Sequence, residues 1–169
     1  MNIFNTNKKT SLYHYIYGKM INLFPCFRRT GGRVIFLSSD WKEIHIKIPK
    51  NWKTRNYVGS IFGGSIMAAS DPFYMLQLIK LLGDKYIVWD KTTHTTFIKP
   101  ALKTIYAKFL ITDENIEEIK KNVALSNKYY MTFDINFIDT ESTIYATINK
   151  TLYISTKEYY NAKKNMTKK

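Results

Sequence analysis

The segment most informative about the fold of this chain reads Asn56-Tyr57-Val58-Gly59-Ser60-Ile61-Phe62-Gly63-Gly64. It places a glycine pair at the start of a run, residues 61–82, that is apolar on every side. A helix that is hydrophobic all round is normally buried all round. We therefore expect a long central helix with a sheet wrapped around it, ended by Gly83.

Asp71 lies inside this apolar run, seven residues after Gly64. An ionised carboxylate removed from water must be paired or neutralised by a shifted pKa, so Asp71 is a candidate site residue. On an ideal helix it lies about 20° around the axis from Gly64, so both residues could face one cavity. Two plainer interpretations stay open: Asp71 could cap a helix that restarts at Pro72, and the glycines could only permit close packing.

Hydrophobic periodicity predicts the remaining elements. Amphipathic helices are expected over residues 12–24 and 113–125, and alternation predicts strands over 34–37, 42–49, 86–98, 104–111, 131–137 and 144–154. This order of elements predicts an α+β architecture, an antiparallel sheet curled around the central helix. We expect one domain over residues 1–156 and a lysine-rich tail over 157–169 that frays.

The net charge of +13 invites a nucleic-acid interpretation, but its distribution argues against one. Residues 157–169 hold five Lys and one Glu, so +4 of the charge lies in the tail, and no nucleic-acid-binding motif is recognisable. The positive charge of the chain would equally suit an anionic small molecule as the ligand. Cys26 is the only cysteine, which excludes an intrachain disulfide, and we expect no metal site, no cofactor, no membrane span and a cytoplasmic location.

The central segment resembles the hotdog-fold acyl-CoA thioesterases. The PaaI-like pattern, an Asn followed by a Gly-Gly pair and then an Asp, has its counterpart in Asn56, Gly63, Gly64 and Asp71 at the same spacing. Further segments look like an uncharacterised hotdog branch of unknown function: Arg55-Asn56-Tyr57-Val58-Gly59, Asp71-Pro72-Phe73-Tyr74-Met75, Trp89-Asp90-Lys91, Phe97-Ile98-Lys99-Pro100 and Lys150-Thr151-Leu152-Tyr153.

The resemblance implies roles for these residues. The amides of Gly63 and Gly64, reinforced by the helix dipole, would bind the oxyanion that forms on the thioester carbonyl. Asp71 would activate water or attack the carbonyl itself, and Asn56 would orient water or substrate. The resemblance also implies a homodimer or a dimer of dimers that binds acyl-CoA.

Three more residues are candidates for substrate binding. Arg55 and Lys99 could meet the phosphates of coenzyme A, and Phe62 stands where many PaaI-like enzymes have His. Phe62 cannot polarise a carbonyl, so a non-catalytic hotdog module that binds acyl-CoA or another apolar ligand is the alternative function.

Other titratable residues carry weaker hypotheses. His94 could replace the missing base, although a structural histidine is the plainer interpretation, and His45 is expected on the solvated face of its strand. Asp90 could form an internal ion pair or act as a second catalytic carboxylate.

Overall fold

The computed structural model describes residues 4–166, so the ends of the expected ranges, residues 1–3 and 167–169, lie outside it. The helices are α1 (Leu12–Ile21), α2 (Pro25–Arg29), α3 (Gly63–Ser70), α4 (Pro72–Leu82), α5 (Asp113–Ser126) and α6 (Lys157–Met166). The strands are β1 (Arg33–Leu37), β2 (Glu43–Ile48), β3 (Tyr86–Phe97), β4 (Ile105–Leu110), β5 (Lys128–Ile138) and β6 (Ile144–Thr156). Every strand that the alternation predicts is present, whereas α2 was not predicted.

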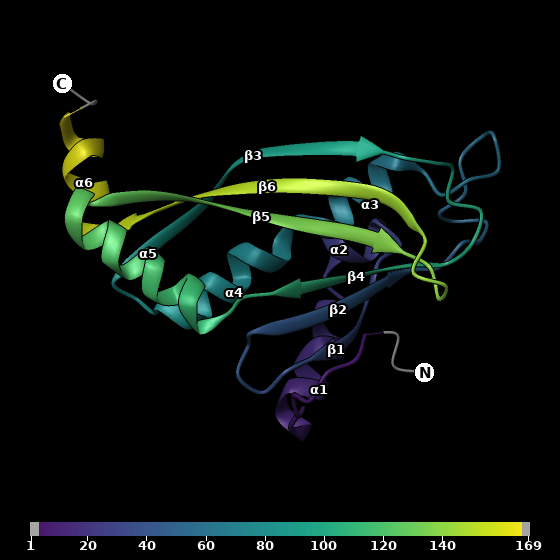
Figure 1. The fold of residues 1–169 in the computed structure, drawn as a ribbon, viewed down its shortest axis with the longest axis horizontal. Coiled ribbons are helices and arrows are strands. Elements are labelled where there is room, and N and C mark those ends of the chain that lie inside the picture. Colours follow the sequence, from purple (N-terminus) through teal and green to yellow (C-terminus); the bar gives the residue numbers. More distant parts are fainter. Residues whose placement is uncertain (1–3, 167–169) are drawn as a thin grey trace.

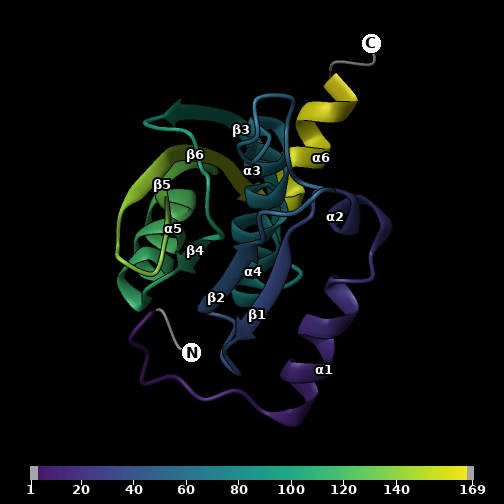
Figure 2. The same ribbon diagram turned by 90° about the vertical axis from the view of Figure 1, so that its right-hand side faces the viewer.

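The six strands form one antiparallel sheet in the order β1-β2-β4-β5-β6-β3. The sheet curves around α3 and α4, which run through its concave side (Figures 1 and 2). The expected α+β architecture, an antiparallel sheet wrapped around a central helix, is confirmed.

Alternating side chains of the strands build the core against α4. In β5 the buried residues are Met131, Phe133, Ile135 and Phe137, and the residues between them are exposed. Tyr74 of α4 stacks on Phe133, with the ring centroids 4.2 Å apart. The Tyr74 ring also contacts the Phe109 ring of β4 edge to face, with the ring centroids 5.2 Å apart.

The central helix is interrupted at Asp71, and it is not buried on every side, so the expectation of burial all round was wrong. Pro72 has no N–H with which to bond the Ala68 carbonyl, and the Asp71 amide donates to that carbonyl instead, at 3.4 Å. Asp71 keeps helical dihedral angles, φ −59° and ψ −50°, so α4 continues the path of α3. Met67 and Ile79 are 42% and 44% exposed, and an open stripe runs along the two helices.

The sheet is nearly divided between β4 and β5. Only one pair, Tyr106 with Ile138, connects these two strands in register. A hollow of about 550 Å³ lies where they diverge, and its lining includes Tyr74, Met131 and Phe133. The two halves of the sheet are therefore held together mainly by side chains of α4.

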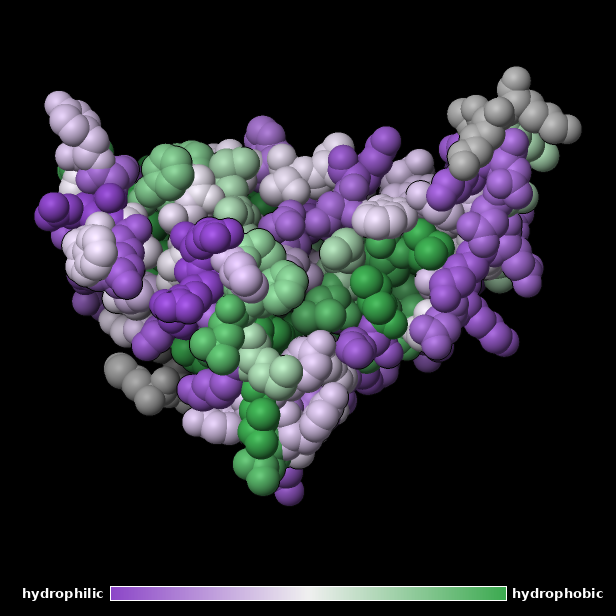
Figure 3. Space-filling view, turned by 180° about the vertical axis from the view of Figure 1, so that it is seen from behind, coloured by the Kyte–Doolittle hydropathy of each residue, from purple (hydrophilic) through white to green (hydrophobic). Residues whose placement is uncertain are grey.

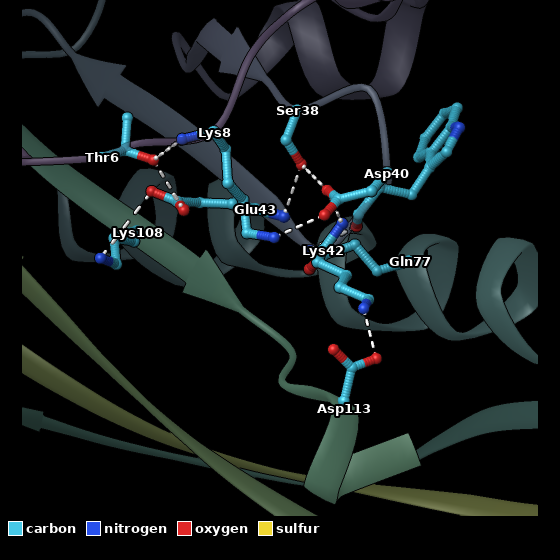
Figure 4. Close-up of polar contacts among 10 residues, drawn as sticks. Thr6, Lys8, Ser38, Asp40, Lys42, Glu43, Gln77, Lys108 and Asp113 are labelled. Atoms are coloured by element: carbon cyan, nitrogen blue, oxygen red, sulfur yellow. Dashed lines mark hydrogen bonds and ion pairs between the residues drawn. The ribbon is translucent and has the colours of Figure 1, made fainter. Parts of the chain in front are cut away.

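The chain before α1 covers the outer face of β2 (Figure 4). Thr6 donates a hydrogen bond to Glu43 at 2.9 Å, and the Phe4 ring packs against His45. His45 is 1% exposed and shares a hydrogen bond of 2.6 Å with Glu43. The expectation that His45 is solvated was wrong, because alternation reveals two faces of a strand but not a segment that covers the outer one.

Local signals explain the ends of α5. The Thr112 hydroxyl accepts from the Asn115 amide at 3.2 Å, and the Asn115 side chain accepts from the Thr112 amide at 3.1 Å, which forms a capping box. Asn127 ends the helix in the left-handed region, at φ 61°.

The C-terminal tail is helical rather than frayed as far as Met166, but α6 buries none of its residues. Within residues 4–166, none of the helices combines the length and the apolar character that crossing a bilayer requires.

Candidate functional site

The glycine pair forms the first turn of α3, and aromatic rings pack against it. A Cβ on Gly63 would lie 2.8 Å from the Phe97 ring, and one on Gly64 would lie 2.4 Å from the Phe62 ring. Both distances are too short for a side chain, so these positions require glycine as long as the rings stay in place. The plainer interpretation, that the glycine pair permits close packing, is therefore correct, and it leaves open whether the pair also binds a ligand.

The same turn leaves main-chain donors unused. The amides of Ser65 and Ile66 both donate to the Phe62 carbonyl, whereas the Gly63 and Gly64 amides have no hydrogen-bond partner in the described part of the chain. Unpaired N–H groups at a helix N-terminus, together with the helix dipole, favour negative charge. The first turn of α3 can therefore stabilise an anionic oxygen.

Asp71 lies at the junction between α3 and α4, and its side chain bonds across to the sheet. Lys150 of β6 donates to the Asp71 carboxylate Oδ1 at 2.9 Å and to the Asp71 main-chain oxygen at 2.7 Å. Asp71 is the N-cap residue of α4 and Pro72 its first helical residue, as the plainer interpretation has it, but the Asp71 side chain makes no capping hydrogen bond. It is 65% exposed, while Lys150 is fully buried.

Asp90 of β3 is the second carboxylate on Lys150, with its Oδ2 2.9 Å from Nζ. Burial raises the pKa of the Asp90 carboxyl above its ordinary value; Lys150 opposes this shift, and the nearby Asp71 adds to it. The other oxygen of Asp90, Oδ1, is buried and has no hydrogen-bond partner among residues 4–166. Of the two expectations for Asp90, the structure shows the internal ion pair.

A β-bulge arranges this part of β3. Register passes from Asp90 opposite Leu152 to Thr92 opposite Thr151, so Lys91 is the extra residue. Because a bulge exchanges the faces of the residues after it, Thr93 and Phe97 turn toward α3. The bulge is thus the reason that one strand supplies both the partner of Lys150 and the ring on Gly63.

Asp71 and Gly64 line one groove of about 480 Å³, which we call the Asp71 groove. Its walls come from α2, α3 and β3: Cys26, Phe27, Thr30, Gly64, Met67, Ala68, Asp71, Pro72 and Thr93. Asp71 is the only charged residue in this lining. The groove combines apolar walls, one carboxylate and a helix N-terminus, which suits a ligand with an apolar chain and a polarised carbonyl.

The other predicted residues lie around the groove rather than in its lining. Asn56 is occupied in a turn, where its amide donates to the Ser60 hydroxyl at 2.8 Å and its oxygen accepts from the Ser60 amide at 3.0 Å. Arg55 forms an isolated bridge with Ile61, just before Phe62. Lys99 lies over the Tyr145 ring, 5.2 Å from its centroid.

Two residues of this cluster were missed as site residues by sequence reasoning. Lys150 follows Ile148 and precedes Leu152, so it occupies an inward position of an apolar alternation, and that is the signal that could have identified it. Thr93 gives no comparable signal, because the bulge decides its direction. His94 is exposed and pairs in register with Asn149, away from the lining of the Asp71 groove.

The sheet wrapped around a central helix defines a hotdog-fold protein, and solved structures that include proteins described as thioesterases or probable thioesterases share this fold. A protein of unknown function from Pseudomonas aeruginosa, described as a probable thioesterase, superposes with a TM-score of 0.73 at 14% identity, over 84% of this chain and 95% of that one. A thioesterase from Haemophilus influenzae gives 0.60 at 12% identity, over 89% and 96%. The PaaI protein of the E. coli phenylacetic acid degradation operon gives 0.56 at 11%, over 83% and 92%.

The chain belongs to the DUF4442 family, described as a domain of unknown function, which matches residues 16–154. A search among curated proteins finds no match. The resemblance to an uncharacterised hotdog branch is thereby confirmed. At these identities the solved structures establish the fold.

Proposed function

We propose that this protein hydrolyses an acyl thioester, of the acyl-CoA class, in the Asp71 groove. The observation that carries the proposal is that one groove holds both the Asp71 carboxylate and the first turn of α3. A carboxylate that accepts a proton and a donor pair that binds an oxyanion are the two groups that thioester hydrolysis needs.

The reaction follows from these groups. Asp71 takes a proton from a water molecule, whose oxygen attacks the thioester carbonyl carbon. The carbonyl oxygen becomes negative and is stabilised by the amides of Gly63 and Gly64 at the α3 N-terminus. The C–S bond then breaks, and the thiolate leaves and takes up a proton, so that a carboxylic acid and a thiol are the products.

Lys150 and Asp90 are positioning residues in this proposal. Because Lys150 holds Oδ1 of Asp71 at 2.9 Å, the carboxylate keeps one orientation, and Oδ2 is the oxygen left to bind water. Asn56 would have to exchange Ser60 for water or substrate in order to take part. Arg55 and Lys99 flank the segments that carry Phe62 and Phe97, where they would meet the phosphates of coenzyme A.

The acting unit in this proposal is a single hotdog domain that works as a homodimer, or as a dimer of dimers. The open stripe on α3 and α4 lies next to β3, and β3 pairs on one side only, with β6. Trp89 and Phe97 on this edge strand are 52% and 53% exposed. A second copy would cover these apolar side chains and close the Asp71 groove. The single free cysteine, Cys26, fits a cytoplasmic location.

The test is thiol release from a panel of acyl-CoA thioesters by the wild type and by Asp71→Asn. Loss of the base is expected to lower the rate by about a hundredfold or more while the fold is kept. Asp84→Asn is the matched control, because Asp84 is exposed and lies outside the Asp71 groove. Undiminished hydrolysis by Asp71→Asn rejects the proposal.

One observation favours a second function, a non-catalytic module that binds acyl-CoA. Phe62 is 56% exposed beside Gly64, and an aromatic ring there can hold an apolar ligand but cannot transfer a proton. Tight binding of acyl-CoA by calorimetry, without thiol release at any pH, would select this function.

A further inference from the structure

Helix α1 has an apolar face that nothing in the described part of the chain covers. Its inner side packs on β1, where Gly18 is buried and a Cβ would lie 3.3 Å from Val34. Its outer side and the turn that follows it carry large apolar residues three and four positions apart, with exposures of 49–75%: Leu12, Ile16 and Met20 on the helix and Leu23 in the turn. We call these four residues the α1 ridge. A helix that is apolar on both sides is stable in water only when the second side is also covered.

The exposed apolar residues of α1 form part of a larger hydrophobic patch on the surface of the molecule. Hydrophobic residues run down to the lowest part of the molecule, where Figure 1 places α1, and hydrophilic residues border them (Figure 3). Tyr13, Tyr15 and Phe24 flank the α1 ridge and are 54–62% exposed. The patch is therefore continuous along the helix, and scattered exposed residues do not account for it.

A basic hollow adjoins the α1 ridge. It has a volume of about 430 Å³, and its cationic lining residues are Arg28, Arg29, Arg33 and Lys53. Leu23 belongs to both features, since it lines the hollow and is 68% exposed. We call it the arginine hollow. It contains three of the four arginines of the chain and no acidic residue.

Cationic residues dominate the N-terminal segment of the chain, although Asp40, which directly follows it, pairs with Lys8. Residues 4–39 contain six cationic residues and no Asp or Glu: Lys8, Lys9, Lys19, Arg28, Arg29 and Arg33. Trp52, on the turn that supplies Lys53, is 80% exposed, with Lys53 5.0 Å above its ring. Exposed Trp and basic residues beside an apolar helix face are typical of surfaces that enter the headgroup region of a membrane.

We propose that the α1 ridge and the arginine hollow bind the surface of an anionic lipid bilayer. A second copy is disfavoured as the occupant, because a two-fold interface would place this cationic surface against itself. An anionic bilayer supplies both complements: acyl chains for the α1 ridge and lipid phosphates for the arginine hollow. The proposal is independent of the thioesterase function, since it uses no residue of the Asp71 groove.

The experiment is co-sedimentation with vesicles of equal parts phosphatidylglycerol and phosphatidylcholine, compared with vesicles of phosphatidylcholine alone. The full chain is expected to bind the anionic vesicles, and to bind them less as salt is raised. Arg28→Gln with Arg29→Gln should weaken binding roughly thirtyfold, from the effect of two charges near a membrane surface. Ile16→Gln with Met20→Gln should weaken it about tenfold or more through lost apolar burial.

Matched controls come from α5, whose outer side is also exposed. Lys120→Gln with Lys121→Gln removes two charges, and Leu125→Gln removes an apolar side chain that is 76% exposed. Both controls should bind like the wild type. Failure of the wild type to bind anionic vesicles overturns the proposal. The proposal is also overturned if the wild type self-associates without binding vesicles and the double variant Ile16→Gln with Met20→Gln abolishes this self-association. Loss of vesicle binding by the α5 controls to the same extent overturns it as well.

Discussion

Lys150 and Asp90 form an ion pair at 2.9 Å although the sheet register sets Lys150 opposite Thr93. Asp90 pairs in register with Leu152, which lies two positions from Lys150 on β6, so Asp90 reaches Lys150 diagonally on one face, and the bulge at Lys91 turns Thr93 to that face as well. Lys150 then reaches Asp90 on its own sheet and Asp71 on the central helix at once. One buried ammonium thus ties the sheet to the helix junction.

Lys150→Met should destabilise the fold by about 3 kcal/mol at neutral pH, because it leaves the Asp90 carboxylate buried without its cation. Burial already raises the pKa of Asp90, so the folded variant binds a proton more tightly than the unfolded chain, and its stability should recover as the pH falls from neutral toward 3.8, the ordinary pKa of Asp. Urea denaturation at both pH values measures this. Adding Asp90→Asn should restore most of the lost stability, and no restoration would contradict the assigned pairing.

Gly64→Ala should lower thioester hydrolysis without a comparable loss of stability. The new methyl group would stand 2.4 Å from the Phe62 ring and would force that ring across the oxyanion site, while Ala is itself a better helix former than Gly by about 1 kcal/mol. Steady-state kinetics and thermal melting separate the two effects. The double variant with Phe62→Ala removes the clash, so it should recover activity; failure to recover would show that the clash is not the cause.

Phe62→His should raise the rate of hydrolysis. The Phe62 ring lies beside Gly64 and is half exposed, so an imidazole fits there and can polarise the thioester carbonyl. General acid–base groups contribute about a hundredfold or more when well placed, and an added group should reach at least part of that. Turnover of acyl-CoA is the measurement, with Phe97→His as the comparison. An unchanged rate would mean that the chemistry does not depend on this position.

His45 should make the fold less stable in mild acid. Burial lowers the pKa of His45 below its ordinary value of 6.5, and Glu43 opposes this shift. Below pH 6.5 the unfolded chain therefore binds a proton at His45 that the folded chain does not yet bind. Stability therefore falls as the pH drops from 6.5 to the lowered pKa, by about 1.4 kcal/mol for each pKa unit of depression. His45→Gln should flatten this slope in denaturation curves, and substitution of the exposed His94, His94→Gln, should not. Parallel slopes for all three proteins would contradict the prediction.

Most of the fold could be predicted because its signals are local. Alternation in residues 131–137 and the apolar run of residues 61–82 depend only on neighbours in sequence. The burial of His45 could not be predicted in this way, because the segment around Phe4 and Thr6 that covers it lies far away along the chain. Periodicity shows which face of a strand is apolar, and it does not show what lies on the other face.

Gly64 and Asp71 could be predicted as site residues because they lie in one short segment of the sequence. Lys150 was missed because its partners come from another strand and from a helix junction, and a single sequence does not show which distant charges meet. Nor does it show the bulge that turns Thr93 and Phe97 toward α3. Buried ion pairs depend on register, and register is a property of the assembled sheet.

The single pair between Tyr106 and Ile138 has a mechanical consequence. Main-chain hydrogen bonds hold β1, β2 and β4 together as one unit, and β5, β6 and β3 as another, but almost none cross from one unit to the other. Tyr74, packed between Phe109 and Phe133 and hydrogen-bonded to the Leu110 main chain, joins the two units through its side chain. Aromatic packing, rather than main-chain hydrogen bonding, therefore determines how stiff the sheet is between β4 and β5. Replacing one of these rings by a smaller side chain would loosen the protein along the boundary between the two units.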